Sequence, residues 1–267
     1  MTTTTHQTLR VTREDDVARV LLHRPDVRNA FNETMIAELT DVFEQLGADD
    51  SLCAIIFGGE GRVFCAGADV DWMRRSMDRT EADNVADAQA MARMYRTIDE
   101  CPVPVIARVQ RAAFGGALGL LAACDVVVAE ADAKLCFSEV RLGIIPAVIS
   151  TFCIAKIGAA QARRYFLTAE LFTAVTAPPG LIHEAVEPGA LDTRIDEILA
   201  SLRDSGPRAV REIKALIRAV AVAPRDEAID LCVRTIARVR VSEEAQAGLR
   251  AFTDKTTPPW QKKADDV

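Results

Sequence analysis

The sequence is short of the residues that metal sites and disulfide-stabilised folds require. Its 267 residues include only three histidines, and the seven cysteines are scattered, odd in number and never spaced as Cys-x-x-Cys. Because disulfide frameworks and zinc sites use paired cysteines, we expect neither, and we predict no metal site. Most of the cysteines lie in apolar segments, which is typical of small buried side chains in a reducing compartment.

An excess of positive charge and long apolar runs are also missing. The net charge is -7, whereas binding to nucleic acid depends on clustered lysine and arginine. No segment reaches the ~20 consecutive apolar residues of a membrane helix, and no cleavable leader is recognisable. We therefore expect a cytoplasmic protein for which neither a membrane nor a nucleic acid is the partner. The threonine-rich residues 1–7 are predicted to form a frayed terminus.

The sequence does contain ample material for one large folded unit, with 49% hydrophobic and 27% charged residues. Apolar, β-rich segments predict strands at residues 17–23, 52–57, 103–109 and 126–129. Helical periodicity predicts helices at residues 32–46, 81–100, 114–124, 151–167, 191–203, 207–221 and along 225–252. Strands that alternate with helices are typical of a largely parallel sheet covered on both faces. We predict an α/β core over residues 8–200 and a C-terminal helical region over residues 201–267.

Two glycine-containing loops each follow a predicted strand and precede a helix. They are residues 64–69 (FCAGAD) and residues 114–117 (FGGA). The start of a helix leaves NH groups unpaired, and small residues allow a ligand oxygen to come close. Two NH groups from different loops would form an oxyanion hole. From spacing alone, close packing of helix against strand explains the glycines equally well, and Asp69 could be simply an N-cap.

A third candidate is Glu139, which lies with Arg141 in the apolar segment 137–146. Burial of a carboxyl group raises its pKa towards the range that a general acid or base needs. A structural ion pair with Arg141, or a solvated strand edge, is the alternative interpretation. The histidines lie far in the sequence from any plausible nucleophile, which disfavours a histidine-dependent triad. Cys65 is more simply a packed side chain than a nucleophile.

Together, these segments resemble the crotonase family, the enoyl-CoA hydratase and isomerase superfamily. The matching pieces, in the order of the family over roughly residues 8 to 255, are residues 23–25 (HRP), 29–31 (NAF), 64–69, 113–120, 123–125 and 137–146. The resemblance implies a core of ββα units of the ClpP/crotonase superfamily, with C-terminal helices that form trimers. It also implies an acyl-CoA substrate and no separate cofactor, because coenzyme A is part of that substrate.

Functional residues can be carried over from the family position by position. The resemblance implies that Ala68 and Gly116 donate their backbone NH groups to the thioester oxygen and that Glu139 carries the proton. Substrate-binding positions implied in the same way are Arg24 or Arg28 near the phosphates of coenzyme A, and Ala66, Asp69, Val70 and Asp71 along its groove.

The resemblance also implies a homotrimer or homohexamer in which a C-terminal helix reaches the ligand of a neighbouring subunit. Phe252 and Lys255 match the positions concerned. Lys255 is therefore expected near the ribose phosphate of the neighbour's coenzyme A, with an ordinary solvated lysine as the alternative.

The sequence departs from the family pattern at two places. Two-glutamate hydratases carry their first carboxylate where this chain has Gly119, so Glu139 alone remains. Residues 147–150 (AVIS) replace a glycine-rich turn that follows Pro146 in many relatives. With residues 72–73 and 163–170, both departures resemble the bacterial methylglutaconyl-CoA hydratase branch, which is linked to leucine breakdown and has a relative that acts on isohexenylglutaconyl-CoA.

Such substrates carry a second carboxylate, which needs a cationic partner if it is enclosed. The arginines nearest to the motifs are Arg74, Arg75 and Arg141. The expected activity is reversible hydration of a 2-enoyl-CoA. A Δ3-Δ2-enoyl-CoA isomerase needs only one base and stays an alternative, as does a non-catalytic paralogue that binds acyl-CoA or RNA.

Overall fold

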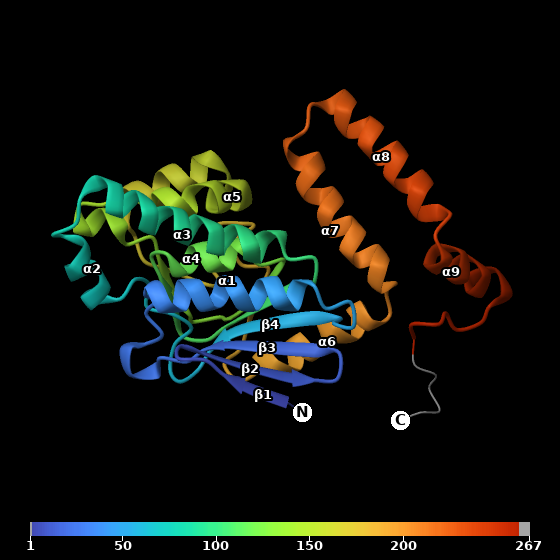
Figure 1. Ribbon diagram of the computed structural model, residues 1–267, viewed down its shortest axis with the longest axis horizontal. Coiled ribbons are helices and arrows are strands. Elements are labelled where there is room, and N and C mark those ends of the chain that lie inside the picture. Colours follow the sequence, from blue (N-terminus) through green and yellow to red (C-terminus); the bar gives the residue numbers. More distant parts are fainter. Residues whose placement is uncertain (1, 262–267) are drawn as a thin grey trace.

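A seven-stranded sheet lies at the centre of the computed structural model, which describes residues 2–261 (Figure 1). Its strands, in spatial order, are β1 (Thr2–Thr5), β2 (Leu9–Glu14), β3 (Val17–Leu22), β4 (Ala54–Gly59), β5 (Val105–Val109), β7 (Val126–Glu130) and β10 (Glu184–Val186). The pairs from β3 to β10 are parallel, whereas β1, β2 and β3 form an antiparallel meander. The prediction of a largely parallel sheet is confirmed.

Helices cover both faces of this sheet because its central strands are apolar on both sides. In β4, Ile55 and Phe57 pack into the larger core, while Ala54 and Ile56 face the opposite way into a second cluster. The larger core is closed by α1 (Glu33–Gly47), α3 (Glu81–Glu100), α4 (Ala117–Ala123) and α5 (Ala147–Thr168). The second cluster is closed by α6 (Leu191–Arg203).

A small second sheet brings the candidate segments together. It consists of β6 (Ala112–Phe114), β8 (Lys134–Cys136) and β9 (Phe172–Thr173). The parallel pairing of β6 with β8 sets residues 115–116, which follow β6, beside the short 3-10 helix η2 (Glu139–Leu142), which follows β8. Two other short helices flank the loops of interest, η1 (Pro25–Val27) and α2 (Val70–Ser76).

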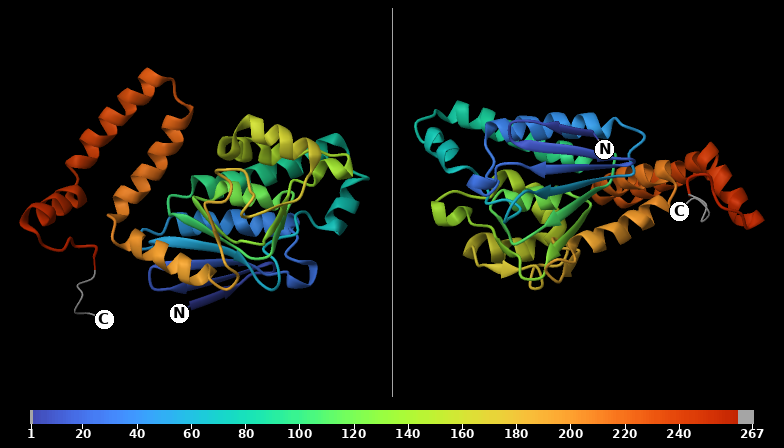
Figure 2. Two further views of the ribbon diagram at one scale, coloured as in Figure 1. Left: turned by 180° about the vertical axis from the view of Figure 1, so that it is seen from behind. Right: turned by 90° about the horizontal axis from the view of Figure 1, so that it is seen from below.

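The last three helices form an arm that projects from the core (Figures 1 and 2). They are α7 (Pro207–Val222), α8 (Arg225–Arg240) and α9 (Glu243–Asp254). The buried Lys214 of α7 anchors the arm, since its Nζ lies 2.6 Å from Asp125 Oδ2 and donates to the carbonyl of Val103. Asp125 in turn accepts a hydrogen bond from the backbone NH of Val105. The arm is thereby joined to the first residue of β5.

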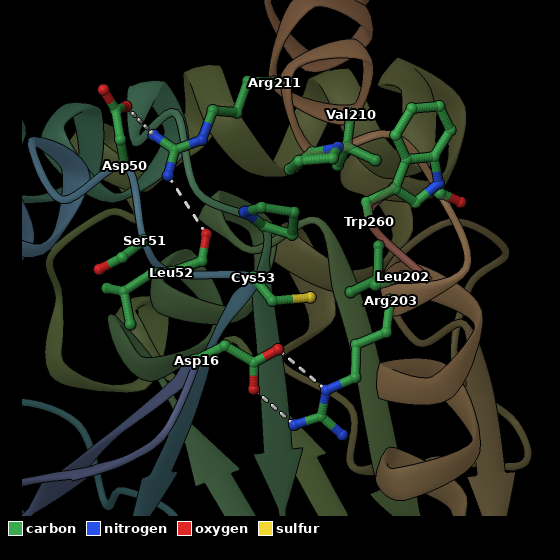
Figure 3. A pocket seen from close by; sticks show the side chains of 13 residues that line it. Asp16, Asp50, Ser51, Leu52, Cys53, Leu202, Arg203, Val210, Arg211 and Trp260 are labelled. Carbon is green, nitrogen blue, oxygen red and sulfur yellow. Dashed lines mark hydrogen bonds and ion pairs between the residues drawn. The ribbon is translucent and has the colours of Figure 1, made fainter. Parts of the chain in front are cut away.

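A crevice of about 200 Å³ marks the place where the arm leaves the core (Figure 3). Arg211 of α7 donates to the carbonyls of Asp49 and Leu52 across it, and Asp16 pairs with Arg203 beneath Cys53. These contacts hold the base of the arm against the amino ends of the central strands.

Three predictions about elements need correction. Residues 2–5 of the expected frayed terminus form β1, because β-branched threonines pair through their backbone with β2 although every side chain is exposed. The helix expected over residues 114–124 starts only at Ala117, since Phe114 belongs to β6. The run along 225–252 is broken after Arg240, and Ser242 caps α9 by accepting from the NH of Ala245.

The predicted boundary between residues 200 and 201 falls inside α6, and residues 262–267 of the predicted helical region lie outside the described residues. In the part of the chain that the structure describes, the helices lack the combination of length and apolar character that crossing a bilayer requires.

Replacement of Lys214 by methionine should lower the free energy of unfolding by about 2 kcal/mol, because it leaves the Asp125 carboxylate without its cation in a partly buried site. Urea denaturation measures the change. Arg238→Met is the matched control, because the ion pair of Arg238 with Glu212 is exposed and should contribute less than about 1 kcal/mol. Equal effects of the two substitutions would show that the buried pair does not anchor the arm.

Candidate functional site

The predicted catalytic positions meet at one cavity of about 210 Å³ beside the carboxyl ends of β4, β6 and β8. Ala68, Gly116 and Glu139 all line it. The rest of its wall is mostly small or apolar: Phe31, Ala66, Gly67, Met73, Met91, Gly115, Ser138, Leu142, Ile144, Ile145, Pro146, Ala147, Val148 and Ile149. Residues from widely separated segments therefore form a single, largely apolar site.

The loop that carries Ala68 is fixed by its backbone. Phe31 donates its NH to the carbonyl of Gly67 and accepts the NH of Asp69, and the intervening NH of Ala68 has no acceptor within residues 2–261. Gly67 has a φ of 93°, and a Cβ there would lie 2.7 Å from the carbonyl oxygen of Phe114. Only glycine permits this left-handed turn and this close approach. The Ala68 NH is consequently available to a ligand.

The second loop is held in a similar way. Gly115 has a φ of 54° and donates its NH to the carbonyl of Cys136. The next NH, that of Gly116, has no acceptor among the described residues. A Cβ at Gly116 would meet the ring of Phe31 at 2.5 Å, so this position must also be glycine. Two unpaired NH groups from different loops therefore border the same cavity, as an oxyanion hole requires.

Glu139 is a half-buried carboxyl group without a counter-ion in residues 2–261. Its Oε2 atom is buried and has no hydrogen-bond partner in the described part of the chain. Burial raises the pKa of Glu139 above its ordinary value. Arg141 does not pair with it, because the Arg141 guanidinium donates to the carbonyl of Ala169 at 2.6 Å. The alternative of a structural ion pair is therefore wrong, and the carboxyl group is free to exchange a proton with a ligand.

The missing second carboxylate is explained by packing. A Cβ at Gly119 would lie 2.3 Å from Cγ2 of Ile149 and 2.9 Å from Cε1 of Tyr95. Ile149 belongs to the segment 147–150 that replaces the glycine-rich turn of many relatives. The two departures from the family pattern are thus one structural feature. The side chain of Ile149, in the segment that follows Pro146, fills the space in front of Gly119.

Asp69 and Arg24 are bound to each other. Oδ1 of Asp69 accepts the NH groups of Asp71 and Trp72 at the start of α2, which confirms the N-cap interpretation. Oδ2 of Asp69 lies 2.8 Å from Arg24, which also donates to the carbonyl of Ala30. This pair braces the loop that carries Ala68.

An adjacent depression of about 500 Å³ shares Ala66 with the cavity, and its wall carries three arginines and one acidic residue, Asp26. Arg28 lines it, together with Arg62 and Arg111, which the sequence analysis did not select. The guanidinium groups of Arg28 and Arg62 form no ion pair with the residues that the structure describes, whereas Arg111 lies 3.3 Å from Asp132. The arginines come from three separate loops, so no local sequence motif connects them.

The remaining predicted positions do not line the cavity. Val70 and Asp71 are exposed at the start of α2, and Phe252 and Lys255 are exposed at the end of the arm. The arginines proposed to meet a distal carboxylate also face elsewhere. Arg74 pairs with Asp71, Arg75 pairs with Glu33, and Arg141 donates to Ala169.

Comparison with known proteins identifies relatives of the whole chain. The model of the enoyl-CoA hydratase/isomerase family matches residues 12–263. The enoyl-CoA hydratase ACTT6 of Alternaria alternata is 32% identical over 246 residues, which cover 91% of this chain and 80% of that protein. The crystal structure of an enoyl-CoA hydratase from Shewanella pealeana is 38% identical with a TM-score of 0.91, covering 95% of this chain and 96% of that one. AtuE of Pseudomonas aeruginosa is 33% identical, with a TM-score of 0.91 over 96% of this chain and 100% of AtuE.

Removal of the charge at position 139 should stabilise the fold at neutral pH. The folded state disfavours ionisation of Glu139, because burial raises its pKa. The cost is absent below the pKa of the unfolded chain, where both states are protonated, and it develops as pH rises through the folded pKa. We expect Glu139→Gln to raise the midpoint of thermal unfolding near pH 8 and to have a smaller effect near pH 5.

Differential scanning calorimetry at both pH values measures this difference. Glu187→Gln is the matched control, because Glu187 is exposed and its substitution should leave the midpoint unchanged at either pH. An equal gain from Glu139→Gln at both pH values would contradict the assignment of the effect to a desolvated carboxylate.

Proposed function

Because the chain belongs to the enoyl-CoA hydratase/isomerase family, we propose that it adds water reversibly across the 2,3 double bond of an enoyl-CoA. The observation that carries the proposal is the meeting of one unpaired, buried carboxyl oxygen with two unpaired NH groups at a single cavity. The crotonase fold of the chain supplies this arrangement. The names of the Alternaria and Shewanella relatives also favour hydration over isomerisation.

The proposed reaction uses the NH groups of Ala68 and Gly116 to hold the thioester oxygen. As the oxygen of water bonds to C3, the electrons of the double bond move onto the thioester oxygen, and Glu139 takes the proton that water loses. The enolate then collapses, and Glu139 returns a proton to C2. An oxyanion donor contributes ~10² to 10³ in rate, and general acid-base catalysis ~10² to 10⁴. Every step is a proton transfer or an addition, so no separate cofactor is required.

Isomerisation of a 3-enoyl-CoA to a 2-enoyl-CoA is the second candidate. It is favoured by the filled space in front of Gly119, where Ile149 and Tyr95 leave no room for a second acidic side chain. In isomerisation, a single base moves a proton from C4 to C2. In hydration, Glu139 must both take the proton that water loses and deliver a proton to C2.

The lining of the cavity bears on which acyl chain the substrate carries. A glutaconyl-type substrate, expected from the resemblance to methylglutaconyl-CoA hydratase, needs a cation for its second carboxylate. Within residues 2–261 no lysine or arginine lines the cavity, whose wall supports an apolar chain instead. The glutaconyl-type substrate remains a prediction from the resemblance, and it requires a cation from a neighbouring subunit.

The basic depression beside the cavity supports coenzyme A as the carrier of that chain. Arg28, Arg62 and Arg111 surround it, and guanidinium groups bind phosphate oxygens well. Ala66 lies on both walls, so a thioester in the cavity can continue directly into the depression.

We further propose that the arm associates with other copies of the chain to form a homotrimer or a homohexamer. Large apolar side chains are exposed along it: Ile213, Ile217, Val222, Ile229, Val233, Ile236, Val241, Leu249 and Phe252. Large apolar patches that are exposed on a monomer commonly mark surfaces that become buried in contact with another chain. In this assembly Phe252 and Lys255 would approach the coenzyme A of a neighbour.

Light scattering should therefore give a mass in solution that is three or six times that of the chain. Val233→Glu places a charge on the apolar surface of α8 and should shift the protein to smaller species. Arg234→Glu, at an exposed polar position of the same helix, is the control and should leave the mass unchanged. A wild-type protein that is monomeric at micromolar concentration would contradict the proposal.

Glu139→Gln should retain acyl-CoA binding and lose at least about 10²-fold in turnover, because glutamine cannot accept a proton. Wild type and variant are incubated with crotonyl-CoA, 3-methylglutaconyl-CoA and a 3-enoyl-CoA. Mass spectrometry then detects any added water, and proton NMR locates the double bond in the products. Gain of one water from a 2-enoyl-CoA supports hydration, whereas a shifted double bond without a gain in mass supports the isomerase. Unchanged turnover in Glu139→Gln would remove Glu139 from the mechanism.

A further inference from the structure

Tyr95 is a buried tyrosine directly behind the cavity wall. It lies on the inner face of α3, and none of its surface is accessible to solvent. Its hydroxyl donates to the carbonyl oxygen of Gly116 at 2.8 Å. Four residues earlier on the same helix, Met91 lines the cavity itself. The helix that borders the ligand therefore also reaches the residue that offers the second NH group.

The Gly115–Gly116 segment needs an external restraint. Two successive glycines can rotate more freely than any other pair of residues, and α4, the helix that follows them, is only seven residues long. The carbonyl of Gly116 accepts from the NH groups of Gly119 and Leu120, but the NH of Gly116, which belongs to the preceding peptide, has no acceptor among the described residues. Without a further contact, that NH could turn away from the cavity.

Tyr95 and Phe31 close the space around Gly116. A Cβ at that position would lie 2.9 Å from the Tyr95 hydroxyl and 2.5 Å from Cζ of Phe31. The same tyrosine ring lies 2.9 Å from the place of a Cβ at Gly119. One side chain thus contacts both the residue that provides the NH group and the residue that stands where relatives carry a carboxylate.

We propose that Tyr95 is a positioning residue. Its hydroxyl holds the Gly116 carbonyl and with it the Gly116–Ala117 peptide. This fixes one end of the preceding Gly115–Gly116 peptide, so that the Gly116 NH which that peptide carries stays directed at the thioester oxygen. This inference rests on the proposed function, because it assigns to Tyr95 the alignment of the proposed oxyanion hole. The ring of Tyr95 also packs α3 against α4 at Gly119, the position where relatives carry the second carboxylate.

The hydroxyl is suited to this role and to no proton transfer. Burial raises the pKa of Tyr95 well above its ordinary value, so the hydroxyl stays protonated and remains a donor. In the part of the chain that the structure describes, the hydroxyl has one acceptor, the Gly116 carbonyl. Tyr95 therefore acts on the reaction through the backbone of Gly116.

Tyr95→Phe removes the hydroxyl and keeps the ring. Outright loss of an oxyanion donor costs ~10² to 10³ in rate, so a loosened donor should cost less, roughly tenfold in kcat. KM should stay within about twofold, because the donor matters most when charge develops on the oxygen. The matched control is Tyr165→Phe, since Tyr165 is the other tyrosine of the chain, is buried, and has its hydroxyl 3.5 Å from the carbonyl of Thr176.

The decisive measurement is the infrared stretching frequency of the thioester carbonyl in bound butyryl-CoA, labelled with carbon-13 at that carbon. Butyryl-CoA is saturated, so it can be neither hydrated nor isomerised. Hydrogen bonds from two NH groups weaken the C=O bond and lower its frequency relative to free butyryl-CoA. We expect this lowering in wild type and in Tyr165→Phe, and a partial return towards the free value in Tyr95→Phe. A merely structural role for the hydroxyl would change the melting temperature and leave the frequency alone.

The outcomes separate the two proposals. A lowered frequency in wild type that is unchanged in Tyr95→Phe, or a Tyr95→Phe variant with wild-type kcat, overturns the role of Tyr95 and leaves the oxyanion hole intact. A wild-type frequency equal to that of free butyryl-CoA overturns the oxyanion hole, and with it the proposed function.

Discussion

The close approach of two backbone segments is the constraint on which the rest of the site depends. Cys65 and Ala113 pair as a short parallel bridge, in which Cys65 donates to the carbonyl of Ala112 and accepts the NH of Phe114. This bridge brings the loop after β4 against the loop after β6. It works only because Gly67 has no side chain to strike the Phe114 carbonyl. With the two loops in this position, the NH groups of Ala68 and Gly116 border the same cavity, and neither has an acceptor among residues 2–261.

The apolar wall of the cavity affects the electrostatics of both the Glu139 carboxyl group and the two NH groups. A cavity of methionine, isoleucine and glycine offers the carboxylate no counter-ion, so its proton is held more tightly than in water. In the proposed reaction, the same surroundings strengthen the hydrogen bonds that the two NH groups donate, because the attraction between an NH dipole and a developing negative charge is larger at a low dielectric constant. The fold therefore gives up some stability at Glu139, and the raised pKa is what the proposed proton transfer requires.

Much of this structure could be predicted from the sequence because its signals are local. The bounds of α3 and α6 agree with the helical periodicity, and the apolar runs located β3, β4, β5 and β7 to within about two residues. The glycine loops were found because each lies at a junction between a strand and a helix, and Glu139 was found because it is a charged residue in an apolar segment. By contrast, β1 has no apolar alternation, and the short strands of the second sheet are too brief for a periodic signal.

What the sequence did not predict rests on contacts between distant segments. Tyr95 reads as one apolar position of α3, and its partnership with Gly116 exists only once α3 and α4 are packed. Arg62 and Arg111 join Arg28 from different loops. The direction of the arm depends on the pair formed by Lys214 and Asp125, which are 89 residues apart. No periodicity or motif encodes such pairs.

The contact between Gly119 and Ile149 has a consequence for how such enzymes can change over time. A glutamate introduced at position 119 would collide with the isoleucine, while loss of the isoleucine alone would open a hole in a packed core. Each substitution is harmful without the other, so the two positions are expected to change as a pair. Lineages with one acidic group and lineages with two would then be separated by an intermediate of low fitness, and single replacements would rarely cross between them.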